Sequence, residues 1–359
     1  MLRQLRGDRG LSLSKVEELT AKLGSPVSRS RLSELERGDV SVHFDDVQVL
    51  CRVYGMDLAD LFIEALAARP SGCFQVESTA EELFEEGKRL FDEGKPLEAG
   101  WAFDAAAEAA AGTDGEMAGL ARTSASFCYD RMGARDLALR RVEQALDLLD
   151  GQSEARWRAT ALMAVLLASS GAAVRARVFL EATLAVMEAG VPPRLRVFLL
   201  DNCGSALHLL GELSEATRLS LEAARLYRRL GEFDWCALKL AAAATYESEQ
   251  GRQKLALRHA RDAEGMLDDL KRVDTRIAVL TALGRVLVAE GAEREARNRL
   301  EEAFRIADLH GLKVRARDVC ELLEHLARQQ GDRSAQRLWR KRLDALPGAG
   351  FDGFSNGAG

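Results

Sequence analysis

Apolar residues between positions 78 and 346 recur three and four places apart on both sides of a regularly placed glycine. This spacing predicts amphipathic helices before and after each glycine. Each period is therefore predicted to be a helical hairpin, and about seven hairpins of period near 40 are expected over residues 78 to 346. The glycines of the period are Gly94, Gly133, Gly171, Gly211, Gly251, Gly291 and Gly331.

Columns of small residues are in phase with these glycines. Alanine stands five residues after the glycine in six of the seven repeats, and small residues stand seven before it in the same six. Small side chains let neighbouring helices approach closely, and a single hairpin cannot cover its own apolar face, so the hairpins must stack into a solenoid with a concave surface. The last repeat carries Glu324, Gln336 and Arg340 at positions of the repeat columns, which predicts a polar cap.

This pattern resembles the tetratricopeptide repeat, most closely in the first unit at Leu83, Gly87, Leu90, Ala99 and Phe103. The period exceeds the roughly 34 residues of the standard unit, which implies longer helices. The glycine-rich segment 347–359 has no apolar pattern and is predicted to be a disordered tail.

Residues 1 to 68 do not follow the repeat. Glycine and proline punctuate them into five short segments, and residues 69–77 are predicted to be a linker. The predicted helices cover residues 1–9, 13–23, 28–37, 44–54 and 57–66.

The run from Ser28 to Gly38 resembles the recognition helix of the Xre-type, phage-repressor-like helix-turn-helix family. The resemblance implies an all-α protein, with a small five-helix lambda-repressor-like DNA-binding domain over residues 1–68 followed by a tetratricopeptide-like α-solenoid. The interval from Ser12 to Ser28 is about five residues longer than is usual for the family, so the second helix or its turn is expected to be lengthened.

The physical chemistry of this segment also favours DNA contact. Ser28 can cap the helix, whose free N–H groups attract phosphate. Arg29 and Ser30 in the first turn, with Glu34 one turn later, are placed to reach base edges, whereas Arg31 and the other basic residues lie nearer the phosphates. The predicted DNA-binding residues are Lys15, Ser28, Arg29, Ser30, Arg31, Ser33, Glu34 and Arg37.

The distribution of charge confines such binding to one region. The whole chain has a formal charge of −6 and a pI near 5.6, which argues against non-specific coating of nucleic acid. Residues 1–37 carry eight basic against five acidic residues, and residues 38–70 carry two against six. A single small module binds DNA weakly, so a palindromic operator in double-stranded DNA and a homodimer formed through the repeats are predicted.

Composition excludes several other classes. An aromatic content of 6% argues against an all-β fold, and no stretch approaches the roughly 20 apolar residues of a membrane helix. The protein is therefore expected to be cytoplasmic with no membrane partner. Its six scattered cysteines form no Cys-x-x-Cys pair, and no catalytic or phosphate-binding motif occurs. We expect no metal, no cofactor and no enzymatic activity.

The order of the two domains is similar to that of the peptide-responsive quorum-sensing regulators (RRNPP type) of Gram-positive bacteria. The resemblance implies transcription regulation by a solenoid that dimerises and binds a signalling peptide or protein on its concave face. That face is expected to carry residues 13, 10, 6 and 3 places before each turn glycine. The candidate peptide-groove residues are Thr123, Asp130, Arg158, Asp201, Asn202, Ser205, His208, Thr245 and Arg285.

Two alternatives stay open at this point. The chain is also compatible with a protein–protein interaction scaffold whose amino-terminal domain does not bind DNA, because charged residues on a helix often form an ordinary solvated face. It is equally compatible with a dimeric repressor whose solenoid takes no ligand.

Overall fold

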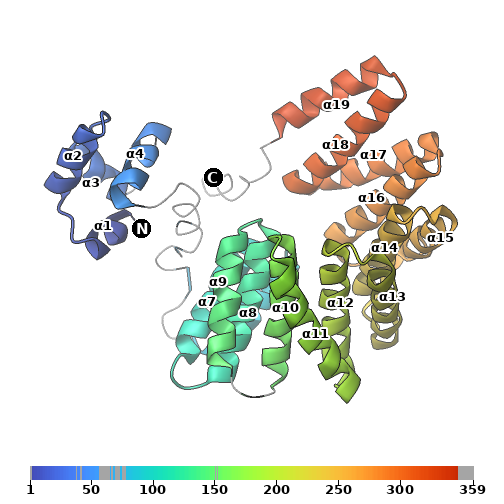
Figure 1. Ribbon diagram of the computed structural model, residues 1–359. Coiled ribbons are helices and arrows are strands. Elements are labelled where there is room, and N and C mark those ends of the chain that lie inside the picture. The colour runs from blue at the N-terminus through green and yellow to red at the C-terminus, as the bar shows by residue number, and fades with distance from the viewer. Residues whose placement is uncertain are drawn as a thin grey trace. The chain divides into compact units, whose positions relative to one another are not determined.

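The computed structural model describes residues 2–37, 39–40, 43–55, 65, 68, 73–74, 78–149, 151 and 153–346. Over these ranges the chain is helical and contains no strand, which confirms the predicted all-α class. It divides into two compact units, Met1–Ser78 and Thr79–Gly359 (Figure 1).

Within its described residues, the first unit holds four short helices, α1 to α4, around a small apolar core. Their bounds agree with the first four predicted helices to within one residue at most ends, whereas the helix predicted at 57–66 lies almost entirely outside the described residues. The helices are α1 (Leu2–Asp8), α2 (Leu13–Lys22), α3 (Arg29–Arg37) and α4 (Phe44–Tyr54). The buried core consists of Val16, Val27, Leu32, Leu35, Val49, Leu50 and Tyr54.

A long connection, Leu23–Ser28, joins α2 to α3. Helix-turn-helix turns are commonly about three or four residues, so the expected lengthening lies in this connection. Thr20 anchors it, because its buried hydroxyl accepts from the Val27 N–H at 3.0 Å and donates to the carbonyl of Glu17. Val27 is itself buried, so the connection is packed against the core.

The second unit is a stack of seven helical pairs within its described residues. The first helix of each pair ends in a turn, and the second returns alongside it (Figure 1). A one-turn 3-10 helix, Leu267–Asp269, follows the fifth pair. The pairs are α6 (Ala80–Asp92) and α7 (Pro96–Ala110), α8 (Gly115–Arg131) and α9 (Arg135–Leu148), α10 (Glu154–Ser169) and α11 (Ala173–Ala189), α12 (Pro193–Leu209) and α13 (Leu213–Leu230), α14 (Phe233–Glu249) and α15 (Gln253–Glu264), α16 (Val273–Ala289) and α17 (Glu293–Leu309), and α18 (Lys313–Gln329) and α19 (Arg333–Ala345).

The periodic glycines form the turns inside the pairs. All seven have a positive φ, between 67 and 81°, a conformation that other residues adopt only with strain. Each first helix therefore ends where the glycine permits the chain to reverse. The spacing of the glycines thus determines the spacing of the hairpins.

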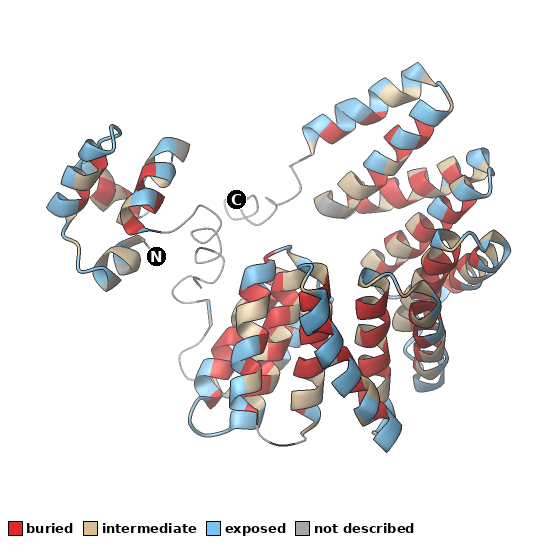
Figure 2. Cartoon of the chain, in the orientation of Figure 1, coloured by how far each residue is buried: buried red, intermediate tan, exposed pale blue. Residues whose placement is uncertain are grey.

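The columns of small residues mark where the two helices of a pair approach each other most closely. A Cβ added to Gly87 would lie 2.7 Å from the ring of Phe103, and one added to Gly284 would lie 2.6 Å from Leu300. The alanines five residues after the glycines are completely buried, and residues coloured as buried lie on the facing sides of the helices in Figure 2. These alanines are Ala99, Ala138, Ala176, Ala216, Ala256 and Ala296.

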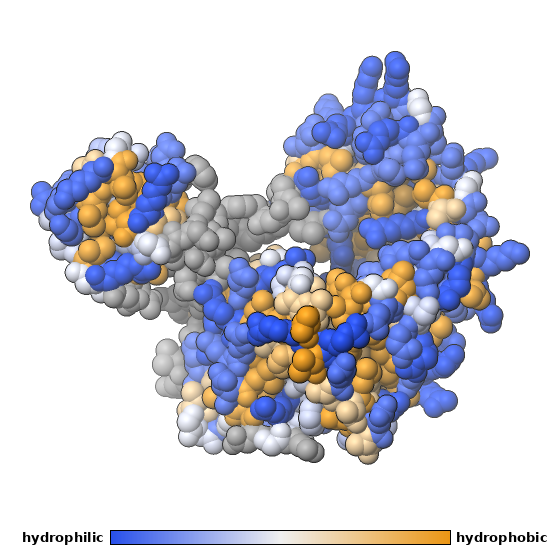
Figure 3. Space-filling view, viewed as in Figure 1, coloured by the Kyte–Doolittle hydropathy of each residue, from blue (hydrophilic) through white to orange (hydrophobic). Residues whose placement is uncertain are grey.

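The last pair departs from this rule. Glu324 and Gln336 replace the small residues, and the Gln336 amide donates to the Glu324 carboxylate at 2.8 Å. Figure 3 shows hydrophilic side chains gathered over α18 and α19. A polar contact thus joins the two helices of the last described pair.

The stack curls strongly enough for distant repeats to meet. Arg131 at the end of α8 forms an ion pair of 2.8 Å with Asp274 at the start of α16, although 143 residues separate them. Arg272 approaches Asp92, at the end of α6, at 3.4 Å. The second unit is therefore a superhelix whose first two repeats touch the sixth.

Candidate functional site

Helix α3 presents one face to solvent and one to the core. Ser28 caps it, since the serine hydroxyl accepts from the Arg31 N–H at 3.2 Å. Leu32 and Leu35 are buried, whereas Arg29, Ser30 and Arg37 are exposed. The helix therefore has the amphipathic placement that a reading helix needs.

Two ion pairs fix the orientation of α3. Arg6 of α1 donates to both carboxylate oxygens of Glu36, at 2.6 and 2.9 Å, and this hydrogen bonding raises the pKa of Arg6 despite the opposing effect of desolvation. Arg31 pairs with Asp46 of α4 at 3.0 Å and is only partly exposed. Arg31 therefore holds α3 against α4, in addition to any contact that it makes with phosphate.

The exposed basic side chains around α3 also have acidic neighbours. Arg29 pairs with Glu17 at 3.1 Å and Arg37 with Asp39 at 2.5 Å. Such exposed pairs are weak and screened by salt, so a phosphate can replace the carboxylate. Ser33 accepts from Arg37 at 2.7 Å, and Glu34 is partly exposed.

Lys15 belongs to the same pattern on α2. Its ammonium lies 2.9 Å from Glu18, which also receives Lys22 at 2.6 Å. These two hydrogen bonds, the one from Lys22 first, lower the pKa of Glu18 to about 2. The sequence analysis placed the basic residues correctly on the surface but did not foresee their partners.

In the second unit, the first helices of successive pairs form one surface, which we call the inner face. Helix α10 packs on α8 and α12, and α16 packs on α14 and α18. We divide the inner face into a central stretch, on α10 and α12, and a carboxyl-terminal stretch, on α14, α16 and α18. Seven of the nine candidate groove residues lie in these stretches, and Thr123 and Asp130 lie on α8.

In the central stretch, three candidate side chains contact side chains of the next repeat. The Arg158 guanidinium stacks on the Phe198 ring at 4.8 Å, and Asp201 forms an ion pair with Lys239 of α14. His208 stacks on Tyr246 with ring centroids 4.2 Å apart. The partners stand about one repeat further along the chain, a signal that the sequence analysis did not use.

The side chains of the remaining central candidates, Asn202 and Ser205, form hydrogen bonds to carbonyl groups one turn earlier in their own helix. Asn202 donates to the Phe198 carbonyl at 2.9 Å and Ser205 to the Asp201 carbonyl at 3.0 Å. His208 also approaches the Glu249 carboxylate at 3.0 Å. The polar groups of the central stretch are thus largely engaged in packing.

The two candidates on α8 lie deeper than expected. Thr123 is only 4% exposed, and its hydroxyl donates to the Gly119 carbonyl at 2.9 Å. Thr123 therefore lies beneath the inner face and offers little to a ligand. Asp130 is partly buried, and this burial raises its pKa.

The carboxyl-terminal stretch differs because it encloses a cavity of about 220 Å³. The candidates Thr245 and Arg285 line it. Sequence reasoning missed the other lining residues, most of which are small or apolar and carry no chemical signal of their own. They are Leu238, Ala241, Ala242, Ile277, Ala278, Thr281, Ala282, Arg315, Asp318 and Val319.

The polar groups that line this cavity differ in whether they already form a hydrogen bond or an ion pair. The hydroxyls of Thr245 and Thr281 donate to carbonyls one turn earlier in their own helices, at 3.1 and 2.7 Å. Arg315 pairs with Asp274 at 2.7 Å. Arg285 is exposed and has no hydrogen bond or ion pair with the residues that the structure describes.

Arg315 connects the cavity to the contact between distant repeats. Burial disfavours the Asp274 charge, but hydrogen bonds from Arg315 and Arg131 hold the pKa of Asp274 below its ordinary value. Arg272 lies 5.3 Å from the ring centroids of both Phe91 and Trp235. We call this contact the closure. Its residues are Phe91, Asp92, Arg131, Trp235, Arg272, Asp274 and Arg315.

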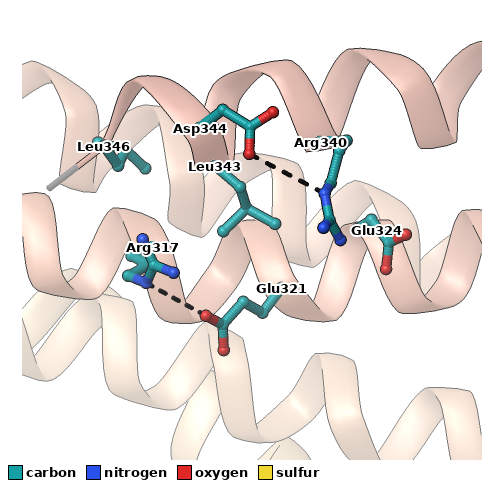
Figure 4. Close-up of a pocket in the computed structure, with 7 residues that line it drawn as sticks. All are labelled: Arg317, Glu321, Glu324, Arg340, Leu343, Asp344 and Leu346. Atoms are coloured by element: carbon teal, nitrogen blue, oxygen red, sulfur yellow. Dashed lines mark ion pairs between the residues drawn. The ribbon is translucent and has the colours of Figure 1, made fainter. Parts of the chain in front are cut away.

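A second cavity, of about 480 Å³, lies between α18 and α19 (Figure 4). Its charged groups pair within single helices, Arg317 with Glu321 at 3.3 Å and Arg340 with Asp344 at 3.9 Å. Glu324, Leu343 and Leu346 complete the lining. This cavity is part of the polar end of the stack.

Within the described ranges, no cluster of three or more histidine, cysteine or acidic side chains is able to hold a metal ion. No described helix has the length and apolar character to cross a bilayer.

The sequence of residues 1–61 matches the helix-turn-helix domain family. No curated protein matches the chain. The first unit is therefore a helix-turn-helix domain.

Three solved structures with a similar fold are 13 to 15% identical to the chain. A Rap protein complexed with competence and sporulation factor has a TM-score of 0.56 at 13% identity, with 96% of each chain covered. The apo form of RapI has 0.53 at 15% identity, covering 74% of this chain and 96% of RapI. A signal transduction ATPase from Pyrococcus horikoshii with a tetratricopeptide repeat sensor has 0.55 at 13% identity, covering 88% of this chain and 50% of that one. The second unit therefore has the fold of a tetratricopeptide-like solenoid.

Proposed function

We propose that this chain is a cytoplasmic, sequence-specific, DNA-binding transcriptional regulator whose solenoid dimerises and senses a peptide or protein ligand. One observation carries the DNA-binding part: α3, in a helix-turn-helix domain, is capped by Ser28 and exposes Arg29, Ser30 and Arg37 together. Its other face is buried in the core, whereas these three side chains are exposed to solvent.

The exposed face suits the major groove of DNA. Arg29 in the first turn can donate two hydrogen bonds to guanine, and Glu34 can accept from cytosine. Arg37 and Lys15 lie where phosphates would replace Asp39 and Glu18 as their partners. Because each cation that neutralises a phosphate releases condensed counterions from the DNA, binding should weaken steeply with salt.

Regulation requires two further elements, dimerisation and a ligand. A single module of this size binds weakly, so we propose a homodimer through the repeats on a palindromic operator. We place a signalling peptide or protein on the inner face, supported by the Rap protein of the same fold that was solved with competence and sporulation factor. The ligand shifts the dimer only if it binds one arrangement better than another.

The test is a binding titration of the full chain on the DNA upstream of its own gene, at two salt concentrations. Arg29→Ala should cost about 1–3 kcal/mol and relax the preference at one base pair. Arg52→Ala, which removes an exposed arginine from α4, is the matched control and should change neither. Unaltered affinity and specificity in Arg29→Ala would reject the assignment of α3.

The alternative of a scaffold is favoured by one specific observation. Arg29, Arg37 and Lys15 are each paired with a carboxylate of the same domain, as in an ordinary solvated surface. Chromatin immunoprecipitation separates the two functions, because a regulator yields discrete palindromic peaks and a scaffold yields none.

The alternative of a ligand-independent dimeric repressor rests on the central stretch. Its side chains are engaged with one another, as expected for a surface that only packs. A variant altered at Arg158, Asp201 and Asn202 that folds and still responds normally in the cell would favour this alternative.

A further inference from the structure

We propose that the cavity between α14, α16 and α18 holds the carboxyl-terminal residue of a peptide, with its apolar side chain inside and its terminal carboxylate on Arg285. The inference rests on the proposed ligand-binding function of the inner face. It specifies where on the inner face the site lies and which end of the peptide the site binds.

The size of the cavity suits a single side chain. Its volume of about 220 Å³ exceeds the roughly 150 Å³ of an apolar protein cavity known to hold benzene. It is smaller than the roughly 300 Å³ at which pockets for whole small molecules begin. One aliphatic or aromatic side chain therefore fits, and a larger ligand must extend along the inner face outside it.

The floor of the cavity selects an apolar group. Ala241, Ala278 and Ala282 come from two adjacent first helices, and Ile277 lies beside them. The threonine hydroxyls on the same wall already donate within their helices, so they have no free hydrogen to offer. A polar side chain would lose its hydration here without finding donors in return.

The rim of the cavity selects an anion. Arg315 forms an ion pair with Asp274, whereas Arg285 forms no hydrogen bond or ion pair with the described residues and interacts with Asp318 only through the electrostatic attraction of the two charges. A guanidinium matches a carboxylate with two parallel hydrogen bonds. Asp318, on the opposite helix, can accept from the amide N–H that precedes a terminal carboxylate.

Only one part of a peptide combines these features. A carboxyl-terminal residue brings an apolar side chain, a carboxylate and an N–H within one residue. An internal apolar residue lacks the anion, and an amino-terminal residue would bring a cation toward Arg285. The central stretch offers no equivalent place, because Arg158 is stacked on Phe198 and paired with Glu154.

The experiment uses the full chain and pooled N-acetylated hexapeptides that end in leucine with a free carboxyl group. Matched pools end in leucine amide or in lysine. Affinity selection with mass spectrometry, followed by anisotropy titration of recovered peptides, should favour the free leucine end. Amidation should weaken binding by about tenfold or more, and Arg285→Ala should remove the difference between acid and amide.

Matched variants distinguish effects on the cavity from effects of the same kind of substitution elsewhere on the surface. Arg305→Ala removes an exposed arginine from α17, a second helix, and should leave the preference intact. Ala278→Phe fills the cavity and should abolish binding of the leucine pool, whereas Ala185→Phe on the exposed surface of α11 should not. Circular dichroism checks that each variant remains folded.

Other outcomes overturn the inference in distinguishable ways. Recovered peptides that bind equally as amides, or equally to Arg285→Ala, reject the carboxyl-terminal site but leave a peptide ligand in place. N-acetyl-leucine competing as strongly as the peptides would identify a small hydrophobic acid instead. If no pool binds the folded chain, both this inference and the proposed peptide ligand fail, while the DNA titration still tests the regulator.

Discussion

The central and carboxyl-terminal stretches of the inner face occupy the same columns of the repeat but use them differently. In the central stretch, Arg158 and Asp201 each have a partner from a neighbouring repeat. In the carboxyl-terminal stretch, alanines leave a hollow, and Arg285 forms no hydrogen bond or ion pair with the described residues. Charged residues on a concave face are thus poor guides to a ligand unless their partners are known.

The difference has a simple physical origin. Neighbouring first helices bring residues one repeat apart into contact. A long side chain in one repeat therefore contacts the residues in the corresponding region of the next repeat. Where both are large and complementary, as in Asp201 and Lys239, they pair. Around Arg285 no ion pair forms with Asp318 of the next repeat, and small side chains leave the hollow open.

The largest expected effect comes from Asp201→Ala. The substitution leaves the Lys239 ammonium unpaired with only 14% of its side chain exposed. Breaking a fully buried pair costs about 3–5 kcal/mol, and the partial exposure here reduces the expected loss of unfolding free energy to about 2 kcal/mol. Urea denaturation measures it, with Asp262→Ala on α15 as the control; equal stability of the two variants would contradict the pairing.

Asp274→Asn tests whether the closure holds the carboxyl-terminal stretch in place. Loss of the charged hydrogen bonds to Arg131 and Arg315 should cost about 1–2 kcal/mol. Hydrogen exchange should accelerate at the end of α8 and the start of α16. The same segments in Asp269→Asn, an exposed position, should exchange as in the unaltered chain.

The same carboxylate makes the closure sensitive to acid. The pKa of Asp274 is lowered in the folded chain, so its contribution is complete above the unfolded value of about 3.9 and is lost as the pH falls through the lower folded value. Exchange at the closure should therefore be constant near neutrality and accelerate only below about pH 4. An onset at pH 6 would assign the effect to another group.

Arg158→Ala removes a stacked guanidinium from the central stretch. The cation–π contact with Phe198 is worth about 0.5–1 kcal/mol, and thermal unfolding should register a loss of that size. Arg158→Lys should restore only part of it, because an ammonium does not stack as a planar guanidinium does. Full stability of Arg158→Ala would show that the stacking contributes nothing.

Arg285→Ala should have the smallest effect on stability. The side chain is exposed and unpaired, so its removal should change the unfolding free energy by less than about 0.5 kcal/mol in the same thermal assay. Together, Arg285→Ala and Arg158→Ala compare the contribution of an arginine to stability in the two stretches. A loss equal to that of Arg158→Ala would mean that Arg285 is structural after all.

The amino-acid sequence by itself determined the helices, their pairing and the turn positions. Helix periodicity, the glycine turns and the small columns are local properties, acting over one turn or one hairpin, so Gly94 and Ala99 could be interpreted without knowing the rest. The capping role of Ser28 was likewise predictable, because a cap involves only three further residues.

Only the tertiary structure decided which candidate side chains are available. The partner of Asp201 stands 38 residues away and that of Arg131 stands 143 away, across a contact that depends on the curvature of the whole stack. That curvature is the sum of small rotations between repeats, and no short segment specifies it. The cavity beside Arg285 exists for the same reason, since three helices from three repeats must converge before alanines enclose a space.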